Sequence, residues 1–240
     1  MELILVRHGE VNISNISNSL KKILETKLLE KYEDTIKKLD NIGLSDSGKE
    51  QANLLGRWLQ KNYKIDTLYS SKLRRAKETS KIVNEFLNLP IIFRDELREA
   101  TFYLPDYLSG WSSPIQFGKD LKKKNFDMRT KIDTTLKERE IKIESLKVKK
   151  AINTQKYENF RKKIEKIIKE IISNNWEKTV LIITHGGAIG TMIRNIIGRH
   201  DMTIRMDFTG LSKFSWIKEY NRWQIDFINK TDHLSAPLSG

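Results

Sequence analysis

Cationic and imidazole side chains lie in the junctions that follow three apolar runs of this sequence. They are Arg7 with His8, Arg74 with Arg75, and His185. If the three runs are neighbouring parallel strands, their carboxyl ends meet at one edge of a sheet, where α/β proteins bind ligands. A guanidinium pairs with two phosphate oxygens at once and keeps its charge at any relevant pH. The sequence therefore predicts a phosphate pocket. Taken alone, Arg7 and His8 could equally well be surface residues at the end of a strand.

Two further features fit phosphate chemistry. Glycines follow both His8 and His185 and let backbone N–H groups approach an anion, and the helix expected after His185 adds partial positive charge. A histidine can attack phosphorus and form a phosphohistidine. The leaving alkoxide then needs a proton, for which Glu96 and Glu99 are the candidates.

The elements that must position these residues alternate along the chain. Strands are expected at residues 3–6, 65–69, 90–93 and 179–184, with helices at about 18–39, 47–62, 76–87, 157–171 and 188–197, and a hairpin over 213–228. Ser47 with Glu50 resembles a capping box at the start of the second helix. This alternation predicts a three-layer α/β/α sandwich with a mainly parallel central sheet, in a single domain over 1–240.

Composition excludes several classes of protein. The 240 residues contain no cysteine, which rules out disulfides and thiolate chemistry, and no apolar run approaches the length of a membrane span. Without a signal-peptide pattern, we expect a cytoplasmic protein. The net charge of +13 favours anionic partners, whether phosphorylated metabolites, nucleic acid or acidic membranes, without deciding among them.

Residues 100–150 differ in character from the rest. The aromatic stretch 100–118 is long for a plain connection and is typical of a lid or binding loop. The lysine-rich stretch 119–150 indicates an inserted helical excursion or, alternatively, a platform for an anionic partner. We expect 100–150 to be an insertion in the single domain.

Four segments in order resemble the histidine phosphatase superfamily, the phosphoglycerate-mutase-like proteins. Leu5-Val6-Arg7-His8-Gly9-Glu10 resembles its signature, Ser71-Lys72-Leu73-Arg74-Arg75-Ala76 with Thr79 its second motif, Leu97-Arg98-Glu99 its acid loop, and Thr184-His185-Gly186-Gly187 its second histidine. The resemblance spans nearly the whole chain. Departures include the added helix at 18–39 and Ser14, where many members carry asparagine.

The resemblance implies roles for five residues. His8 would be the phosphorylated nucleophile, Arg7 and Arg75 phosphate clamps, His185 a further phosphate ligand and Glu99 the proton donor. It selects Arg75 over Arg74 and Glu99 over Glu96, and it gives Glu10 a supporting role in its loop.

Two histidines are left outside this pocket. We expect His200 to lie on the surface. The segment Asn229 to Leu234, which includes His233, resembles a tail of the family's phosphatases and is interpreted as structural. No metal ligand set and no cofactor is predicted, since neither histidine has a carboxylate or cysteine at ligand spacing.

We therefore expect a metal-independent phosphomonoester hydrolase that acts on a small phosphorylated substrate through a phosphohistidine on His8. The alternatives are a phosphoglycerate-type mutase, a non-catalytic phosphate-binding protein, and a nucleic-acid-binding protein that uses 119–150. Among anionic partners, nucleic acid is less favoured than a small phosphorylated substrate. No membrane association is expected. The sequence leaves open whether the chain forms a homodimer.

Overall fold

A computed structural model of the chain describes residues 1–12, 40–99, 154–200 and 204–235. Met1–Thr101 and Arg161–Gly240 make up one compact unit, and Phe102–Phe160 another. All the contacts described below belong to the first unit.

Three of the predicted segments lie outside the described residues: the helix at 18–39, the aromatic stretch 100–118 and the lysine-rich stretch 119–150. The expected insertion at 100–150, and with it the single-domain organisation, stays a prediction.

Strands and helices alternate along the first part of the unit, and a hairpin closes it. The elements are β1 (Glu2–Arg7), α3 (Asp46–Asn62), β2 (Thr67–Ser71), α4 (Arg74–Leu87), β3 (Ile91–Arg94), η2 (Asp95–Leu97), α9 (Thr154–Asn174), β4 (Thr179–Thr184), α10 (Gly186–Ile197), β5 (Leu211–Ile217), β6 (Arg222–Lys230) and η4 (Asp232–Leu234).

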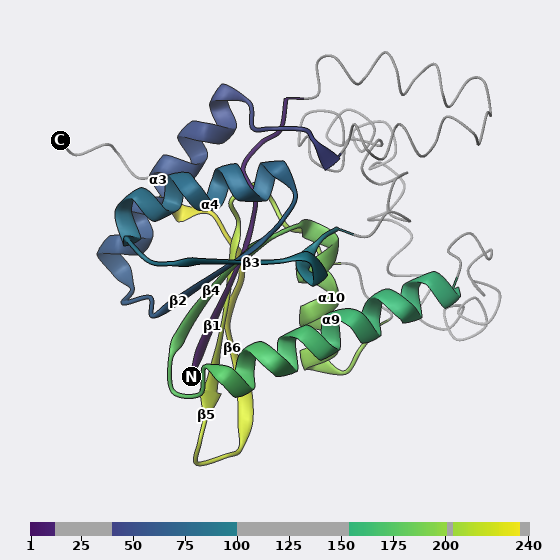
Figure 1. The fold of residues 1–240 in the computed structure, drawn as a ribbon. Coiled ribbons are helices and arrows are strands. Elements are labelled where there is room, and N and C mark those ends of the chain that lie inside the picture. The colour runs from purple at the N-terminus through teal and green to yellow at the C-terminus, as the bar shows by residue number, and fades with distance from the viewer. Residues whose placement is uncertain (13–39, 100–153, 201–203, 236–240) are drawn as a thin grey trace, which may run out of the picture. The chain divides into compact units, whose positions relative to one another are not determined.

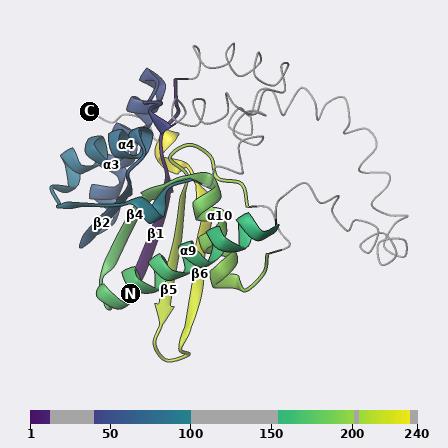
Figure 2. The same cartoon turned by 45° about the vertical axis from the view of Figure 1, so that its right-hand side comes forward.

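The strands form one six-stranded sheet in the order β3-β2-β4-β1-β5-β6. The pairs among β3, β2, β4 and β1 are parallel, and the β5–β6 hairpin joins the edge of β1 in antiparallel orientation. Helices α3 and α4 cover one face, and α9 and α10 cover the other (Figures 1 and 2). The predicted three-layer α/β fold with a mainly parallel sheet is confirmed.

The central strands are buried on both faces, which is why they are continuous apolar runs rather than alternating ones. In β1, Ile4 and Val6 pack in a core with Leu55 of α3 and Val83 of α4, and every one of these side chains is fully buried. The neighbouring Leu5 points to the opposite face and is equally buried. The two helical layers therefore hold β1 and β4 in place from both sides.

Helix α3 begins two residues earlier than the predicted capping box implies, so that prediction was wrong. Its N-cap is Ser45, whose hydroxyl accepts a hydrogen bond from Gly48 N at 3.0 Å. The same hydroxyl donates to the Glu10 carboxylate at 2.8 Å. Glu10 therefore selects Ser45 over Ser47 as the cap, because it adds a second hydrogen bond to the capping side chain.

The register of the sheet brings three loops to one edge. Arg7, the last residue of β1, lies opposite Thr184, the last residue of β4, and Ser70 of β2 lies opposite Ile183. The ladder continues one residue further, where His8 N donates to Thr184 O at 2.9 Å. The segments that follow the three strands thus leave the sheet side by side.

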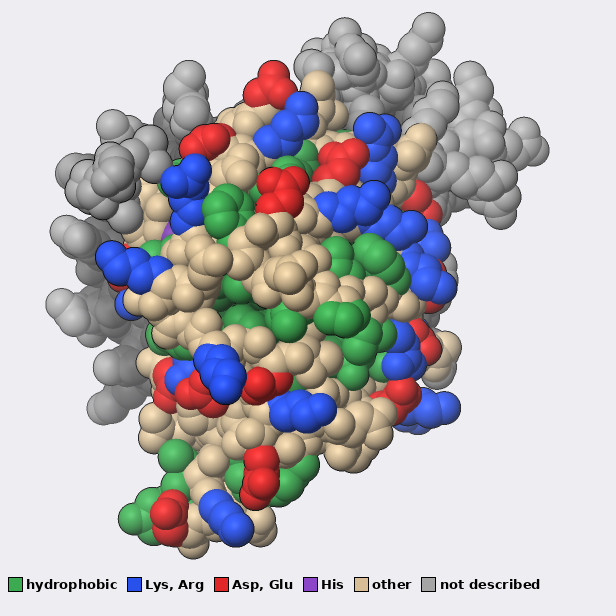
Figure 3. All heavy atoms as spheres, turned by 60° about the vertical axis from the view of Figure 1, so that its left-hand side comes forward, with side chains coloured by type: hydrophobic (Ala, Val, Ile, Leu, Met, Phe, Trp, Pro, Cys, Tyr) green, Lys and Arg blue, Asp and Glu red, His purple; other side chains and the backbone are tan. Residues whose placement is uncertain are grey.

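Among the described residues, no helix has both the length and the apolar character that a membrane span requires. On the face drawn in Figure 3, Lys and Arg side chains are interspersed with Asp and Glu. The positive net charge is therefore not gathered into a single basic patch on that face.

Candidate active site

His8 is held in one tautomer by its two ring contacts. Its Nδ1 lies 2.8 Å from the carbonyl oxygen of Gly9, which can only accept, so Nδ1 carries the proton. Its Nε2 lies 3.2 Å from Nε of Arg75, which can only donate. Nε2 therefore has a lone pair available. Burial, then the charges of Arg75 and Arg7, hold the pKa of His8 well below its ordinary value, so the ring is neutral.

Arg75 lies in the first turn of α4, and its side chain is 1% exposed. Thr79, one turn later, accepts from Gly9 N at 3.0 Å and donates to Arg75 O at 2.8 Å, which ties the helix to the loop of His8. Burial lowers the pKa of Arg75 to about 10, and the Glu99 carboxylate opposes that shift. Arg75 thus stays a cation at neutral pH.

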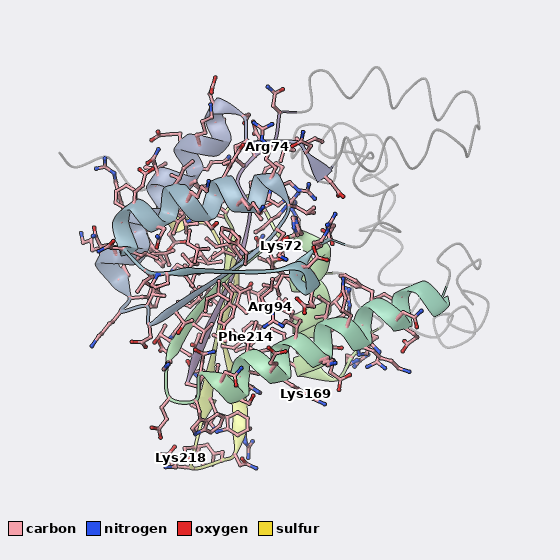
Figure 4. All side chains as sticks on the ribbon, in the orientation of Figure 1. Lys72, Arg74, Arg94, Lys169, Phe214 and Lys218 are labelled. Carbon is pink, nitrogen blue, oxygen red and sulfur yellow. The ribbon has the colours of Figure 1, made fainter. Side chains whose placement is uncertain are left out.

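Arg74, its neighbour in the sequence, lies on the outer side of the helix (Figure 4). Its Nε pairs with Glu78 at 2.6 Å, and its side chain is half exposed. Successive helical residues are rotated by about 100°, which places one guanidinium in the pocket and the other in solvent.

Arg7 reaches the pocket from the end of β1. Its Nη1 donates to the carbonyl oxygen of Met206 at 2.6 Å, and its guanidinium lies 4.2 Å from the ring centre of Phe208. Burial lowers the pKa of Arg7 to about 10, against the opposing charges of Glu99 and Asp207. Within the described part of the chain its Nε is buried with no hydrogen-bond partner.

His185 follows β4 and caps the start of α10. Its Nε2 lies 2.8 Å from the Ser71 hydroxyl at the end of β2, and its ring centre lies 5.1 Å from that of His8. Burial, then the charge of Arg75, holds the pKa of His185 well below its ordinary value. Its Nδ1 is the second buried nitrogen of the pocket with no partner among the described residues.

Glu99 comes from the loop after η2 and faces the same pocket. Its Oε2 accepts from Gly187 N, in the first turn of α10, at 3.0 Å. Glu96, the other candidate, pairs with Arg94 at 3.1 Å, and Arg94 also pairs with Glu170 of α9 at 2.6 Å. The geometry therefore favours Glu99 as the carboxyl group at the pocket.

Together these side chains form a compact anion site at the sheet edge. It contains the buried side chain of Arg75, the partly buried side chain of Arg7, two neutral imidazoles and the N-terminus of α10, which carries partial positive charge. The Ser71 hydroxyl accepts from Leu73 N and so donates its own proton to His185 Nε2, which leaves the His185 proton on Nδ1. A buried donor without a partner is costly, so Arg7 Nε and His185 Nδ1 favour an incoming oxyanion. The carboxyl of Glu99 lies beside them as an acid or base.

Sequence reasoning missed three groups that hold these residues: the Ser71 hydroxyl, the Met206 carbonyl and the Phe208 ring. Ser71 stands inside the second motif, so its position was a usable signal. Met206 and Phe208 follow no motif quoted from the sequence.

The remaining predicted residues lie elsewhere. His200 is exposed, as expected. Glu10 supports its loop, since its N–H donates to the Gln51 side chain at 2.9 Å. In the described ranges, no group of three or more His, Asp and Glu side chains is placed to hold a metal ion.

The sequence matches a known protein family and a curated relative. The sequence model of the histidine phosphatase superfamily (branch 1) matches residues 3–231. A Bacillus subtilis protein described as the uncharacterized phosphatase PhoE is 28% identical over 200 residues, which covers 82% of this chain and 86% of that protein.

Solved structures share the fold. A phosphoserine phosphatase from Entamoeba histolytica, in complex with 3-phosphoglyceric acid, has a TM-score of 0.58 at 20% identity and covers 97% of this chain and 98% of its own. The alpha-ribazole phosphatase of Shigella flexneri has a TM-score of 0.57 at 19% identity, with 96% and 97% covered.

Proposed function

Since the chain belongs to the histidine phosphatase superfamily (branch 1) and is a phosphatase, we propose that His8 is its nucleophile and that Arg7, Arg75, His185 and Glu99 complete the reaction centre. The hydrogen bonds of His8 carry this proposal. With Nδ1–H donated to Gly9 O, the lone pair of Nε2 is left as the reactive one, and the buried ring is neutral, as a nucleophile must be.

In the first step, the phosphoryl group of the substrate lies between the two guanidiniums. Arg7 Nε, Arg75 and His185 Nδ1 donate to its oxygens, and the two guanidinium cations stabilise the charge on the equatorial oxygens in the transition state. Nε2 of His8 attacks phosphorus, the P–N bond forms and the ester P–O bond breaks. The leaving oxygen takes its proton from Glu99.

In the second step, water hydrolyses the phosphohistidine. The Glu99 carboxylate takes a proton from the attacking water, the P–N bond breaks, and inorganic phosphate leaves. Both the carboxyl and the imidazole are then restored. While His8 is phosphorylated, its ring carries a positive charge, which the Gly9 carbonyl oxygen on Nδ1 stabilises.

A small phosphorylated molecule is the proposed substrate, and the phosphatase is proposed to need no metal ion. A phosphoglycerate-type mutase would use the same phosphohistidine, but the matched relatives are described as phosphatases and do not favour it. A homodimer and a cytoplasmic location stay predictions, as does the lesser alternative of nucleic-acid binding by 119–150.

The test is phosphate release from an aryl phosphate with EDTA present, together with alkaline quenching of the enzyme after mixing with a phosphoryl-labelled substrate. The intact protein should release phosphate and carry acid-labile, base-stable label, and His8→Ala should do neither. His200→Ala, which removes an exposed histidine, is the matched control and should behave as the intact protein does. Equal release by a folded His8→Ala would overturn the proposal.

A further inference from the structure

The segment Met206–Gly210 supports the guanidinium of Arg7 from two directions. The Met206 carbonyl accepts from Arg7 Nη1 at 2.6 Å, and the Phe208 ring lies over the guanidinium at 4.2 Å. The backbone adds a third link, because Arg7 N donates to Gly210 O at 3.3 Å. The orientation of Arg7 therefore depends on where this segment lies.

The segment also contacts the nucleophile loop. Thr209 N donates to the carbonyl oxygen of His8 at 3.3 Å, and the ring of Phe208 lies 5.8 Å from that of His8. Thr209 is fully buried, with φ of 54°, which a β-branched residue rarely adopts. Such strain persists only where surrounding contacts fix the residue, so something must hold Thr209 in place.

His233 of η4 provides that contact. The Thr209 hydroxyl donates to Phe208 O at 2.7 Å, so its oxygen is the acceptor for the proton on His233 Nε2, at 2.9 Å. The His233 side chain is 1% exposed, and its ring lies 6.3 Å from that of Trp58 on α3. The imidazole is thus fixed between a scaffold helix and the segment that supports Arg7.

Asn229 fixes the same segment independently, two residues away. Its Oδ1 accepts from Asp207 N at 2.7 Å, and its Nδ2 donates to the Asp207 carboxylate at 2.9 Å. The contact is close, because a Cβ at Gly210 would lie 2.3 Å from Asn229 Oδ1. Asn229 and His233 both belong to the tail segment, Asn229 to Leu234, that the sequence analysis interpreted as structural.

We propose that His233 is a positioning residue for Arg7, which acts through the Thr209 hydroxyl and the segment Met206–Gly210 to aim the guanidinium at the substrate phosphate. The inference rests on the proposed function, since it takes Arg7 to be a phosphate ligand. His233 itself touches neither His8 nor Arg7 in the hydrogen bonds described, so its effect must pass through Thr209 and Phe208.

The test compares His233→Leu, which keeps the bulk but loses the donor, with His233→Gln, whose amide N–H can still donate to Thr209. Leu234→Ala is the matched control, because it removes packing from the same short helix and leaves the hydrogen bond. Thermal unfolding, kcat and KM for an aryl phosphate, and calorimetric binding of inorganic phosphate are measured for each. We expect His233→Leu to weaken phosphate binding about tenfold, because the charge-assisted hydrogen bond from Arg7 to phosphate would lose its alignment. The phosphate affinities of His233→Gln and Leu234→Ala should stay within about twofold of that of the intact protein.

A double-mutant cycle separates positioning from stability. In an Arg7→Ala background, His233→Leu should change phosphate affinity less than about twofold, because the group it positions is gone. The same loss with and without Arg7, or a lower unfolding temperature with unchanged affinity, would assign His233 a structural role only. Calorimetry measures phosphate binding without turnover. If the intact protein binds phosphate but hydrolyses no phosphate ester, the proposed function is contradicted, and the coupling between His233 and Arg7 can still be measured.

Discussion

Nε of Arg75 lies 3.2 Å from Nε2 of His8, so the buried cation donates to the one imidazole nitrogen that has a lone pair. The contact has two consequences. It directs the lone pair toward the position where the guanidinium would bind phosphate, and the positive charge helps to keep the imidazole neutral. The nucleophile and the phosphate ligand are thereby aligned before a substrate arrives.

Arg75→Ala should lower kcat/KM for an aryl phosphate by about a hundredfold or more, the usual cost of removing one preorganised donor to transition-state charge. Arg74→Ala is the matched control one residue earlier. It removes a half-exposed pair with Glu78, which is worth about 0.5 kcal/mol of stability, and a long hydrogen bond to Asn41 O, and it should leave the kinetics unchanged. Steady-state kinetics on both variants check this, and an Arg74→Ala defect as large as that of Arg75→Ala would contradict the assignment.

Glu99→Gln should show a defect that depends on the leaving group. An alkyl phosphate, whose alkoxide needs a proton, should react about a hundredfold more slowly or worse, because general acid catalysis contributes that much. A nitrophenyl phosphate, whose leaving group departs as the anion, should be much less affected in the phosphorylation step, which a single-turnover burst isolates.

The control for that experiment is Glu96→Gln. Its carboxylate pairs with Arg94 outside the pocket, so both substrates should react as with the intact protein. A leaving-group-dependent defect in Glu96→Gln and none in Glu99→Gln would reverse the choice between the two carboxyls.

Much of this site was predictable because it is built at the ends of apolar strands. Parallel neighbours place the residues after β1, β2 and β4 together whatever the helices do, and these residues include His8 and His185. The choice of Arg75 over Arg74 needed the family resemblance. Which of two adjacent residues faces inward depends on where the helix starts, and the sequence of the junction does not fix that residue.

Other contacts could not be predicted. The acceptor for Arg7 is a backbone carbonyl 199 positions away in the sequence, and a carbonyl group has no residue identity that a pattern could detect. The N-cap at Ser45 was missed for a related reason: Ser45 and Ser47 are equally good capping residues, and the choice depends on Glu10, which is distant in sequence.

Gly9→Ala should destabilise the fold by about 1–3 kcal/mol, the cost of overpacking a close contact. A Cβ at this position would lie 2.5 Å from the backbone oxygen of Gly48, and a backbone atom at the start of α3 cannot move aside as a flexible side chain can. Urea unfolding with the slope held constant measures the loss.

Gly190→Ala is the control for that loss, within the helix interior of α10. The nearest atom to its Cβ would be 3.5 Å away, an ordinary contact, so the helix preference of alanine should leave the protein as stable or up to about 1 kcal/mol more stable. Equal stability of Gly9→Ala and the intact protein would show that the loop of His8 does not lie against Gly48 as described.

Acid should destabilise the protein partly through His233. Burial lowers the pKa of His233 to about 4, from an ordinary 6.5, so the unfolded chain takes up a proton between these values while the folded chain does not. Stability from this group is complete above pH 6.5 and is lost as the pH falls toward 4, by roughly 3 kcal/mol. His8 and His185 act in the same direction.

The variant His233→Gln has no imidazole to protonate, so its free energy of unfolding should fall less steeply between pH 6.5 and 4, with a slope smaller by up to one proton. Urea unfolding at a series of pH values compares the variant with the intact protein. Parallel curves would mean that His233 titrates alike in the folded and unfolded chains, contrary to its burial against Trp58.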